Sequence, residues 1–260
     1  MKISFYKYQG TGNDFVIINN FTEDATPLTS KQIRTICNRH FGVGADGLML
    51  LNKVANYDFG MQYFNADGSE SSMCGNGGRC LVKFAHAMGI HKSSFSFLAI
   101  DGIHEAELMD DGKVRLKMCN VSAIEYHNGH AILNTGSPHF VKFSNKVQDI
   151  DVALTGKEIR FSTQFAKEGI NVNFAENLSQ DTIYVRTYER GVEDETLSCG
   201  TGVTAAALLF AHNDNGFNTV EVKTPGGNLS VEFNKKNDQE FENIWLCGSA
   251  QFVFKGEIDI

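Results

Sequence analysis

The sequence is poor in proline and in positive charge and has no long apolar run, and each scarcity excludes a class of protein. Only 3 of the 260 residues are proline, whereas 25 are glycine, so glycine supplies most of the special backbone positions. Lys and Arg number 23 against 31 Asp and Glu, and the resulting net charge of −8 argues against nucleic-acid binding. No apolar run approaches the length of a membrane span. We therefore expect neither a nucleic-acid partner nor a membrane segment.

The cysteines show neither a disulfide framework nor a zinc site, because no C-x-x-C pair occurs in this long chain. They are Cys37, Cys74, Cys80, Cys119, Cys199 and Cys247. The histidines and acids also lack metal-ligand spacing, and no phosphate-binding G-x-x-x-x-G-K-[ST] loop is present. The first ten residues, MKISFYKYQG, contain no apolar run of signal-peptide length. We expect a cytoplasmic protein with reduced thiols and no metal.

Strand-like segments greatly outnumber helical ones, and the pattern starts again near residue 120. Periodicity predicts helices over about 29–40, 76–88, 151–165 and 201–212. It predicts strands over 3–8, 14–19, 48–53, 58–64, 94–100, 103–109, 113–118, 130–135, 139–143, 170–175, 182–188, 218–223, 228–233, 243–247 and 250–255. We expect an α+β protein of two similar domains, each a mostly antiparallel or mixed sheet wrapped around a central helix. Without a Pro- or Ser-rich linker, the two domains should meet tightly and leave a cleft.

One short phrase occurs twice in the chain. Residues 67–84 read DGSESSMCGNGGRCLVKF, and residues 192–210 read VEDETLSCGTGVTAAALLF. In each copy a glutamate, Glu70 or Glu195, precedes a cysteine, Cys74 or Cys199, by four positions. Each cysteine opens a Cys-Gly-polar-Gly run that leads into a helical pattern. Two matched cysteines, 125 positions apart, indicate two similar halves that face one another.

A cysteine at the start of a helix has a defined chemistry. The first turn leaves backbone N–H groups unpaired and carries the positive end of the helix dipole, which favours the thiolate form of a nearby thiol. The same N–H groups bind anions, and glycine lets a carboxylate approach the backbone closely. Two such sites facing one another would hold one carboxylate and place a thiol on each side of the adjacent carbon. That arrangement suits stereoinversion by two bases.

The other candidate functional residues can also be explained by ordinary structural roles. The dipeptide Glu189-Arg190 ends a predicted strand and is suited to a zwitterion, although such a pair is usually solvated. His139 is suited to orienting or deprotonating a thiol, and equally to a hydrogen-bonded place in the core. Asparagines at loop or strand edges are as easily explained by turns, and these are Asn13, Asn65 and Asn171. The other four cysteines read as small buried hydrophobic residues.

The motifs resemble the diaminopimelate epimerase family, the cofactor-independent amino-acid epimerases of lysine and cell-wall precursor synthesis. The resemblance covers nearly the whole chain. It is carried by KYQGTGNDFVIIN at 7–19, GVGADG at 42–47, FNADGSESSMCGNGGRC at 64–80, GSPHFV at 136–141, NVNF at 171–174, ERG at 189–191 and ETLSCGTGVTAAA at 195–207. The related proline racemases also pair two cysteines but lack the GTGNDF and FNADGS phrases.

The resemblance implies a role for each matching residue. Cys74 and Cys199 would be the acid–base thiols, supported by His139 and Glu189 as further catalytic residues, with Glu189 also pairing with a substrate ammonium. Backbone amides for the reacting carboxylate would come from Gly75, Asn76, Gly200 and Thr201. The distant amino-acid end would be held by Asn13, Asn65, Asn171 and Arg190. The substrate would be diaminopimelate, without metal or pyridoxal phosphate, and a homodimer is possible.

The resemblance also implies an arrangement of domains. Residues 1–120 with 248–260 would form an N-terminal domain carrying Cys74, and residues 121–247 a C-terminal domain carrying Cys199. The two would be pseudo-symmetric, with the active site in the cleft between them.

Three departures from the family pattern affect the expected substrate contacts. Ser137 stands where asparagine is common before Pro-His, so that contact should be shortened or water-mediated. Gly47 stands where some members carry glutamine, so a contact there should be lost. The stretch ERGVEDETLSC (189–199) is one residue longer than the usual pattern, and its acids Glu193 and Asp194 leave the loop path open.

Three other functions fit parts of the sequence. A related racemase acting on another amino acid would use the same cysteine pair. A cysteine hydrolase would use Cys74 as the nucleophile and His139 as the base, but it leaves the second cysteine motif unexplained. A non-catalytic ligand-binding protein would not need the intact pair.

Overall fold

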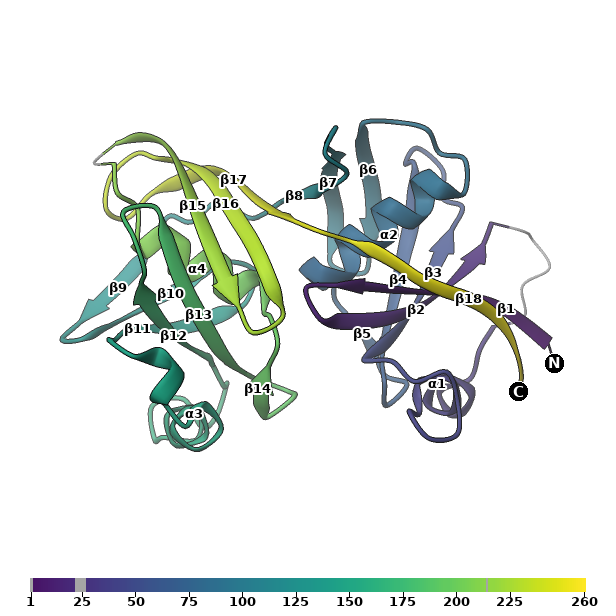
Figure 1. Cartoon of the computed structure of the whole chain (residues 1–260), viewed down its shortest axis with the longest axis horizontal. Helices are drawn as coiled ribbons and strands as arrows, with labels where there is room; N and C mark the ends of the chain where they lie inside the picture. Colours follow the sequence, from purple (N-terminus) through teal and green to yellow (C-terminus); the bar gives the residue numbers. More distant parts are fainter. Residues whose placement is uncertain (1, 22–26, 214) are drawn as a thin grey trace. The chain divides into compact units, whose positions relative to one another are not determined.

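The computed structural model describes residues 2–21, 27–213 and 215–260, and the chain divides into two compact units. Unit 1 consists of Met1–Leu116 with Gly248–Ile260, and unit 2 consists of Lys117–Cys247. The C-terminal segment therefore belongs to the same unit as the N-terminal one. Each unit has its own sheet and its own central helix (Figure 1).

The strands of unit 1 pair in the order β18-β1-β2-β3-β4-β6-β7-β8, with β5 added to β4. The β2–β3 and β4–β6 pairs are parallel and the others are antiparallel. The strands are β1 (Lys2–Gly10), β2 (Asn13–Asn20), β3 (Gly47–Asn52), β4 (Phe59–Asn65), β5 (Glu70–Ser71), β6 (Ser94–Ala99), β7 (Gly102–Leu108), β8 (Val114–Lys117) and β18 (Gln251–Asp259).

Unit 2 repeats this topology. Its strands pair in the order β9-β10-β11-β12-β13-β15-β16, with β14 added to β13, and the β11–β12 and β13–β15 pairs are the parallel ones. The strands are β9 (Ile124–His127), β10 (His130–Asn134), β11 (Pro138–Phe143), β12 (Asn171–Asn177), β13 (Thr182–Glu189), β14 (Asp194–Thr196), β15 (Gly216–Thr224), β16 (Gly227–Lys235) and β17 (Phe241–Gly248). The duplication inferred from the cysteine phrases therefore extends to the order and direction of the strands.

The sheet of each unit wraps around a largely buried helix, as predicted. In unit 1, α2 (Gly75–Ala87) packs against β1, β2, β3, β4 and β7. In unit 2, α4 (Gly200–Leu209) packs against β11, β12, β13, β15 and β16. From Gly202 to Leu208 every residue of α4 is buried, which explains why this helix is apolar on all sides.

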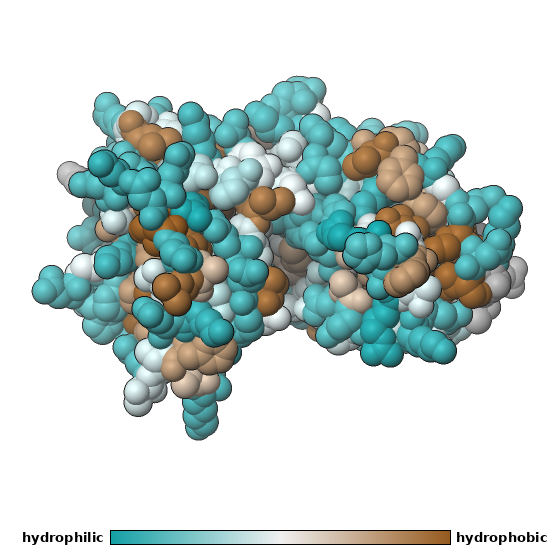
Figure 2. Space-filling view, turned by 60° about the horizontal axis from the view of Figure 1, so that its bottom comes forward, coloured by the Kyte–Doolittle hydropathy of each residue, from teal (hydrophilic) through white to brown (hydrophobic). Residues whose placement is uncertain are grey.

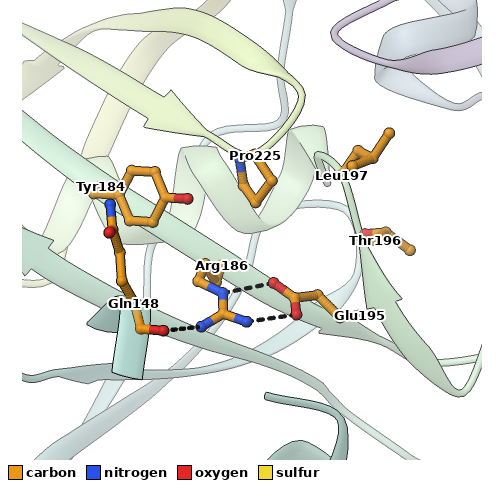
Figure 3. A pocket seen from close by; sticks show the side chains of 7 residues that line it. All are labelled: Gln148, Tyr184, Arg186, Glu195, Thr196, Leu197 and Pro225. Atoms are coloured by element: carbon orange, nitrogen blue, oxygen red, sulfur yellow. Dashed lines mark hydrogen bonds and ion pairs between the residues drawn. The ribbon is translucent and has the colours of Figure 1, made fainter. Parts of the chain in front are cut away.

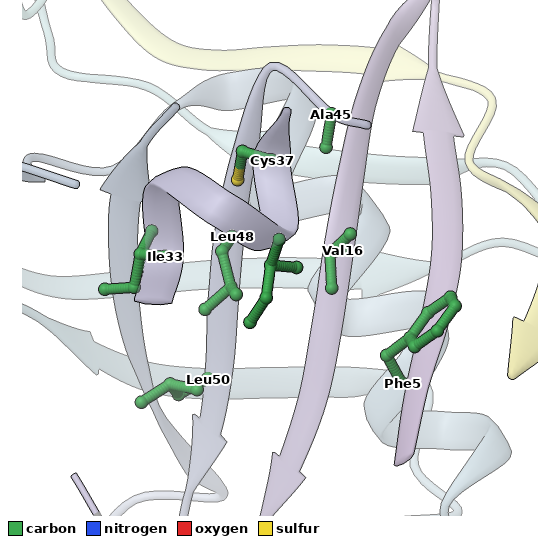
Figure 4. Close-up of a cluster of buried hydrophobic side chains, with 8 residues drawn as sticks. Phe5, Val16, Ile33, Cys37, Ala45, Leu48 and Leu50 are labelled. Carbon is green, nitrogen blue, oxygen red and sulfur yellow. The ribbon is translucent and has the colours of Figure 1, made fainter. Parts of the chain in front are cut away.

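A second helix covers the outer face of each sheet. Figure 4 shows α1 (Ser30–Cys37) lying over β1, β2 and β3. The helix starts at Thr29, which forms a capping box with Gln32. The buried side chains between α1 and the strands include Phe5, Val16, Ile33, Ile36, Cys37, Ala45, Leu48 and Leu50. In unit 2, α3 (Val152–Arg160) approaches β13 so closely that a Cβ on Gly156 would lie 2.4 Å from Cβ of Tyr188.

Several predicted boundaries were wrong. The helix expected to reach about residue 40 ends at Cys37, because the Asn38 side chain accepts the N–H groups of residues 40 and 41 and starts a turn. The helix expected over 151–165 ends at Arg160 with Phe161 as its C-cap, and it is followed by Ser162 and Thr163, residue types that disfavour helix interiors. The helix expected to reach 212 ends at Leu209. The short strands β5, β9 and β14 were not predicted.

Cys119 is a further correction, because its thiol is exposed rather than buried. All six cysteines lie in the described part of the chain. No helix among the described residues is long and apolar enough to cross a membrane. The face seen in Figure 2 is mainly hydrophilic, with small hydrophobic patches on each unit.

Candidate active-site residues

Each of the two repeated cysteines is the N-cap residue of its central helix, so the prediction that they open helices is confirmed. Cys74 precedes α2 with φ −92° and ψ 128°, and Cys199 precedes α4 with φ −113° and ψ 111°. Neither helix has a side-chain hydrogen bond that caps its first turn. The first-turn N–H groups, those of Gly75 and Asn76 and of Gly200 and Thr201, have no intrahelical partner. Each helix start is therefore suited to an anion next to a thiol.

In unit 1, Asn13 lies beside Cys74. The Asn13 side-chain oxygen is 3.6 Å from Sγ of Cys74 and 3.4 Å from Nδ2 of Asn76. On its other side, Nδ2 of Asn13 donates to Asp46 at 2.5 Å. Asn13 therefore connects the Cys74 thiol to Asp46, directly before β3, and the sequence did not indicate this contact.

The position of Asn13 is fixed by the turn before it and the charges behind it. The β1–β2 turn is formed by Thr11 and Gly12 with φ of 54° and 83°, which is the left-handed conformation of a tight hairpin. Next to Asn13, the Asp14 carboxylate binds Lys7 and Arg39. Although burial acts to raise the pKa of Asp14, its hydrogen bonds to Arg39 and Lys7 lower it to about 2. Asp14 is therefore ionised at neutral pH.

Arg79 is a site residue that the sequence analysis missed. Its side chain is completely buried, and it donates to the Gly75 carbonyl at 3.3 Å, to Oγ1 of Thr11 at 2.7 Å and to Oδ1 of Asn76 at 2.9 Å. It thereby joins the first turn of α2 to the β1–β2 turn that carries Asn13. Its place five residues after Cys74, on the buried side of the helix, was the available signal.

In unit 2, Asn171, Ser137 and Arg190 form one hydrogen-bonded group. Asn171 donates to Oγ of Ser137 at 2.9 Å and accepts from the Arg190 backbone N–H at 2.8 Å. The Arg190 guanidinium donates to Ser137 at 3.4 Å and to the Glu168 carbonyl at 3.0 Å. Ser137 therefore joins two predicted substrate-binding residues.

The stretch from Arg190 to Cys199 follows a defined path rather than an open loop. The Glu193 N–H donates to the Glu189 carbonyl at 2.8 Å, and β14 then pairs back on β13. The side chain of Glu193, with φ 60°, accepts from Tyr188 and Gly191. The extra residue of this stretch is thus accommodated in a tight hairpin. Glu189, at its base, accepts from Thr196 at 3.0 Å.

The repeated glutamates anchor the cysteine segments to the neighbouring strand. Glu195 forms a two-pronged ion pair with Arg186 of β13, at 2.6 and 2.7 Å. Figure 3 shows this pair at one side of a pocket of about 560 Å³ in unit 2. At the matching place in unit 1, Glu70 accepts from Gln62 of β4 at 3.0 Å. The glutamate of each phrase is therefore structural.

His139 is completely buried at the start of β11. Burial, and secondarily the positive charge of Arg190, lower the pKa of His139 to about 3. The ring is therefore neutral at neutral pH. Its Nδ1 lies 3.0 Å from Nδ2 of Asn173, whereas Nε2 has no hydrogen-bond partner in the described part of the chain. Asn173 is a second residue that the sequence analysis did not single out, although it stands two positions after Asn171.

Asn65 and Gly47 are the remaining positions of unit 1 that the sequence analysis singled out. Asn65, the last residue of β4, has its side chain directed to Oγ of Ser69 at 3.3 Å within the turn that leads to β5. At Gly47, a Cβ would lie 2.5 Å from the Tyr63 ring. Tyr63 thus occupies the space that a longer side chain at position 47 would need. Among the described residues, no group of three or more His, Cys, Asp or Glu side chains is placed to hold a metal ion.

The fold is a repeated sheet around a central helix, with a cysteine at the start of each of the two helices. The family model for diaminopimelate epimerase matches residues 5–124 and 131–253. The chain therefore belongs to the diaminopimelate epimerase family. It is 46% identical over 257 residues to the diaminopimelate epimerase of Flavobacterium psychrophilum, covering 98% of this chain and 100% of the relative. It is 41% identical to that of Chlorobaculum tepidum, covering 96% and 99%.

Solved structures show the same fold at low sequence identity. A phenazine biosynthesis protein of the PhzF family from Bacillus anthracis matches with a TM-score of 0.73 and 16% identity, covering 100% of both chains. A hydroxyproline epimerase from Agrobacterium vitis matches with a TM-score of 0.68 and 12% identity, covering 99% of this chain and 91% of the other. The predicted α+β fold class is confirmed.

Proposed function

We propose that this protein interconverts LL- and meso-diaminopimelate by moving the proton of one α-carbon. The observation that carries the proposal is the pair of cysteines at the N-caps of α2 and α4, within a chain that belongs to this family. One thiolate removes the α-proton and the other thiol delivers a proton to the opposite face. The thiolate that takes the α-proton becomes a thiol, and the thiol that delivers a proton becomes a thiolate. The number of protons on the pair is therefore unchanged, and the two cysteines exchange roles in the reverse reaction.

The helix starts support this chemistry electrostatically. Carbanion character develops next to the substrate carboxylate when the α-proton leaves. Backbone N–H groups of Gly75, Asn76, Gly200 and Thr201 stabilise that charge where it develops.

The residues at the strand ends are suited to the second amino-acid group of the substrate. Arg190 offers a guanidinium to a substrate carboxylate, and Glu189 offers a carboxylate to a substrate ammonium. The side chains of Asn65 and Asn171 each contain both a hydrogen-bond donor and an acceptor. Asn13, which contacts the Cys74 thiol, serves both the thiol and the substrate. This polar set favours diaminopimelate over an amino acid with an apolar side chain such as proline.

NMR of the reduced protein with LL-diaminopimelate in deuterium oxide tests the proposal. We expect loss of the α-proton signal together with appearance of the meso isomer. If other amino acids exchange their α-proton and diaminopimelate does not, the protein is a related racemase. A covalent acyl adduct on Cys74 would indicate a hydrolase. Binding of diaminopimelate without any exchange would indicate a ligand-binding protein.

We further propose that two copies associate through β18, and that the enzyme acts in the cytoplasm, where its thiols stay reduced. β18 pairs with β1 and is exposed from Gln251 to Lys255. Three consecutive apolar residues, Phe252, Val253 and Phe254, are 52%, 51% and 45% exposed. The β1–β18 register shifts between Lys7 and Tyr8, and the Phe252 ring contacts Tyr8 whereas the Phe254 ring contacts Phe5, so both faces of β18 present apolar surface. A long apolar strand of this kind is a site of self-association.

Val253→Lys tests the association. We expect the unaltered protein to have the mass of a dimer in light scattering after gel filtration, and Val253→Lys to have the mass of a monomer, because a charge in an apolar interface is desolvated without a partner. Val192→Lys is the matched control, since Val192 is 58% exposed in unit 2. A monomeric unaltered protein, or a dimeric Val253→Lys variant, would refute the β18 interface.

A further inference from the structure

The two central helices rest on equivalent positions that differ in chemistry. In unit 1, β2 and β3 pair so that Phe15 lies opposite Gly47, and Met49 lies opposite Tyr63 of β4. In unit 2, His139 lies opposite Asn171, and Asn173 lies opposite Thr187. The three matched positions are therefore Phe15, Met49 and Tyr63 in unit 1, and His139, Asn173 and Thr187 in unit 2.

The third residue after each cysteine, Gly77 in unit 1 and Gly202 in unit 2, lies against these matched positions. A Cβ on Gly77 would lie 3.1 Å from Sδ of Met49 and 3.5 Å from the Phe15 ring. A Cβ on Gly202 would lie 2.2 Å from Oδ1 of Asn173. The second glycine of the Cys-Gly-Thr-Gly run thus makes room for Asn173, whereas its counterpart in unit 1 faces apolar, adaptable atoms. The matched positions under the two helices thus share one geometry, but the positions of Phe15 and Met49 in unit 1 are taken by the polar residues His139 and Asn173 in unit 2.

The orientation of Asn173 follows from its two other partners. Oγ1 of Thr187 donates to Oδ1 of Asn173 at 2.9 Å, and Nδ2 of Asn173 donates to the Phe140 carbonyl at 3.0 Å. A carbonyl oxygen only accepts, so the amide nitrogen must be on that side. The second hydrogen of the same nitrogen is directed to Nδ1 of His139 at 3.0 Å. Nδ1 therefore accepts, and the ring proton of neutral His139 is on Nε2.

We propose that Asn173 is a positioning residue that keeps the proton of His139 on Nε2, so that His139 donates a hydrogen bond to a catalytic thiolate instead of taking a proton from a thiol. Nε2 is completely buried and has no partner among the described residues, which leaves this donor available. The role of the thiolate rests on the proposed epimerase function, whereas the position of the proton does not. Because unit 1 carries Phe15 at the matched place, the duplicated half offers no equivalent donor there.

Nitrogen-15 NMR of the histidine ring tests the position of the proton without substrate. In the unaltered reduced protein at neutral pH, we expect a protonated Nε2 and an accepting Nδ1 for His139. A protonated Nδ1 would overturn the proposal. The proposed function can fail in the exchange experiment while this result stands, so the two failures are distinguishable.

Asn173→Asp tests the role of Asn173. A carboxylate has no hydrogen to give, so Nδ1 must then be protonated. At low pH the ring of this variant carries both protons and still donates from Nε2, and at high pH it loses the Nε2 proton. We therefore expect kcat/KM of Asn173→Asp to fall by about 10²-fold as pH rises through this new titration, the usual effect of losing one donor in a site. An unchanged pH profile and an accepting Nδ1 would overturn the proposal.

Gly202→Ala and the cysteine variants complete the test. Gly202→Ala displaces Asn173, so the fixed tautomer of His139 should be lost, whereas Gly77→Ala, which meets the flexible Met49 side chain, should leave the tautomer unchanged. The proton on Nε2 should change its chemical shift in one of Cys74→Ala and Cys199→Ala, which identifies the accepting thiolate. If the shift changes in neither, His139 donates to no catalytic thiolate.

Discussion

Alanine at position 74 or at position 199 is expected to lower the rate of epimerisation by about 10²- to 10⁴-fold, the range usual for loss of a positioned acid–base group. Each variant keeps one thiol at a helix start and loses the group that serves the other face of the α-carbon. The measurement is the appearance of the meso isomer from LL-diaminopimelate in deuterium oxide. The remaining thiolate is still able to exchange the α-proton of one isomer with retention of configuration. That residual exchange assigns each cysteine to one isomer.

Cys119→Ala is the control for this experiment. Its thiol is exposed and lies outside both repeated phrases, so its removal should leave epimerisation unchanged. Cys80 is unsuited as a control, because it is completely buried and burial raises the pKa of its thiol to about 12. Normal epimerisation by either Cys74→Ala or Cys199→Ala would exclude the two-thiol mechanism.

The second large effect is on stability. Leu208→Ala should lower the free energy of unfolding by about 2–5 kcal/mol, the range for removal of a buried leucine side chain. Leu208 is 1% exposed on α4, which packs against five strands of unit 2, so the vacated space cannot be filled by solvent-facing groups. Chemical denaturation followed by circular dichroism measures the loss.

Leu209→Ala is the neighbouring control. Leu209 is half-buried at the C-terminal end of the same helix, so its truncation should cost clearly less than that of Leu208. Leucine and alanine are both good helix formers, so the difference between the two variants reports mainly burial. Equal losses for the two variants would contradict the placement of α4 inside the sheet.

Most of the fold could be predicted from the sequence because its signals are local. Alternating apolar residues indicated the long strands, and the Cys-Gly-polar-Gly phrases indicated the helix starts. The short strands β5 and β14 have only 2 and 3 residues, too few for an alternating pattern to emerge. Helix ends were misjudged where a side chain such as that of Asn38 captured backbone N–H groups.

The candidate site residues could be predicted where the sequence motif occurs twice, and not where a residue lies outside the repeated part of the motif. The two cysteines stood out because the same phrase occurs twice. Arg79 and Asn173 did not, because their roles depend on which strand lies beneath the helix, and register between distant strands is not visible in a single sequence. Glu70 and Glu195 were conspicuous in the sequence, yet each binds a neighbouring strand, to Gln62 and Arg186 respectively. Repetition therefore marked both catalytic candidates and their structural supports.

The pairing of β18 with β1 has a consequence for synthesis of the chain. Unit 2 is one continuous segment, whereas unit 1 receives its last strand only from residues 251–259. Once residue 247 has left the ribosome, unit 2 is therefore complete while β1 still lacks one of its two neighbouring strands. Proteins made of several parts generally fold part by part as they emerge. Protease digestion of a released chain that ends at residue 247 should thus find unit 2 resistant and β1 accessible, and resistance of both would contradict this order.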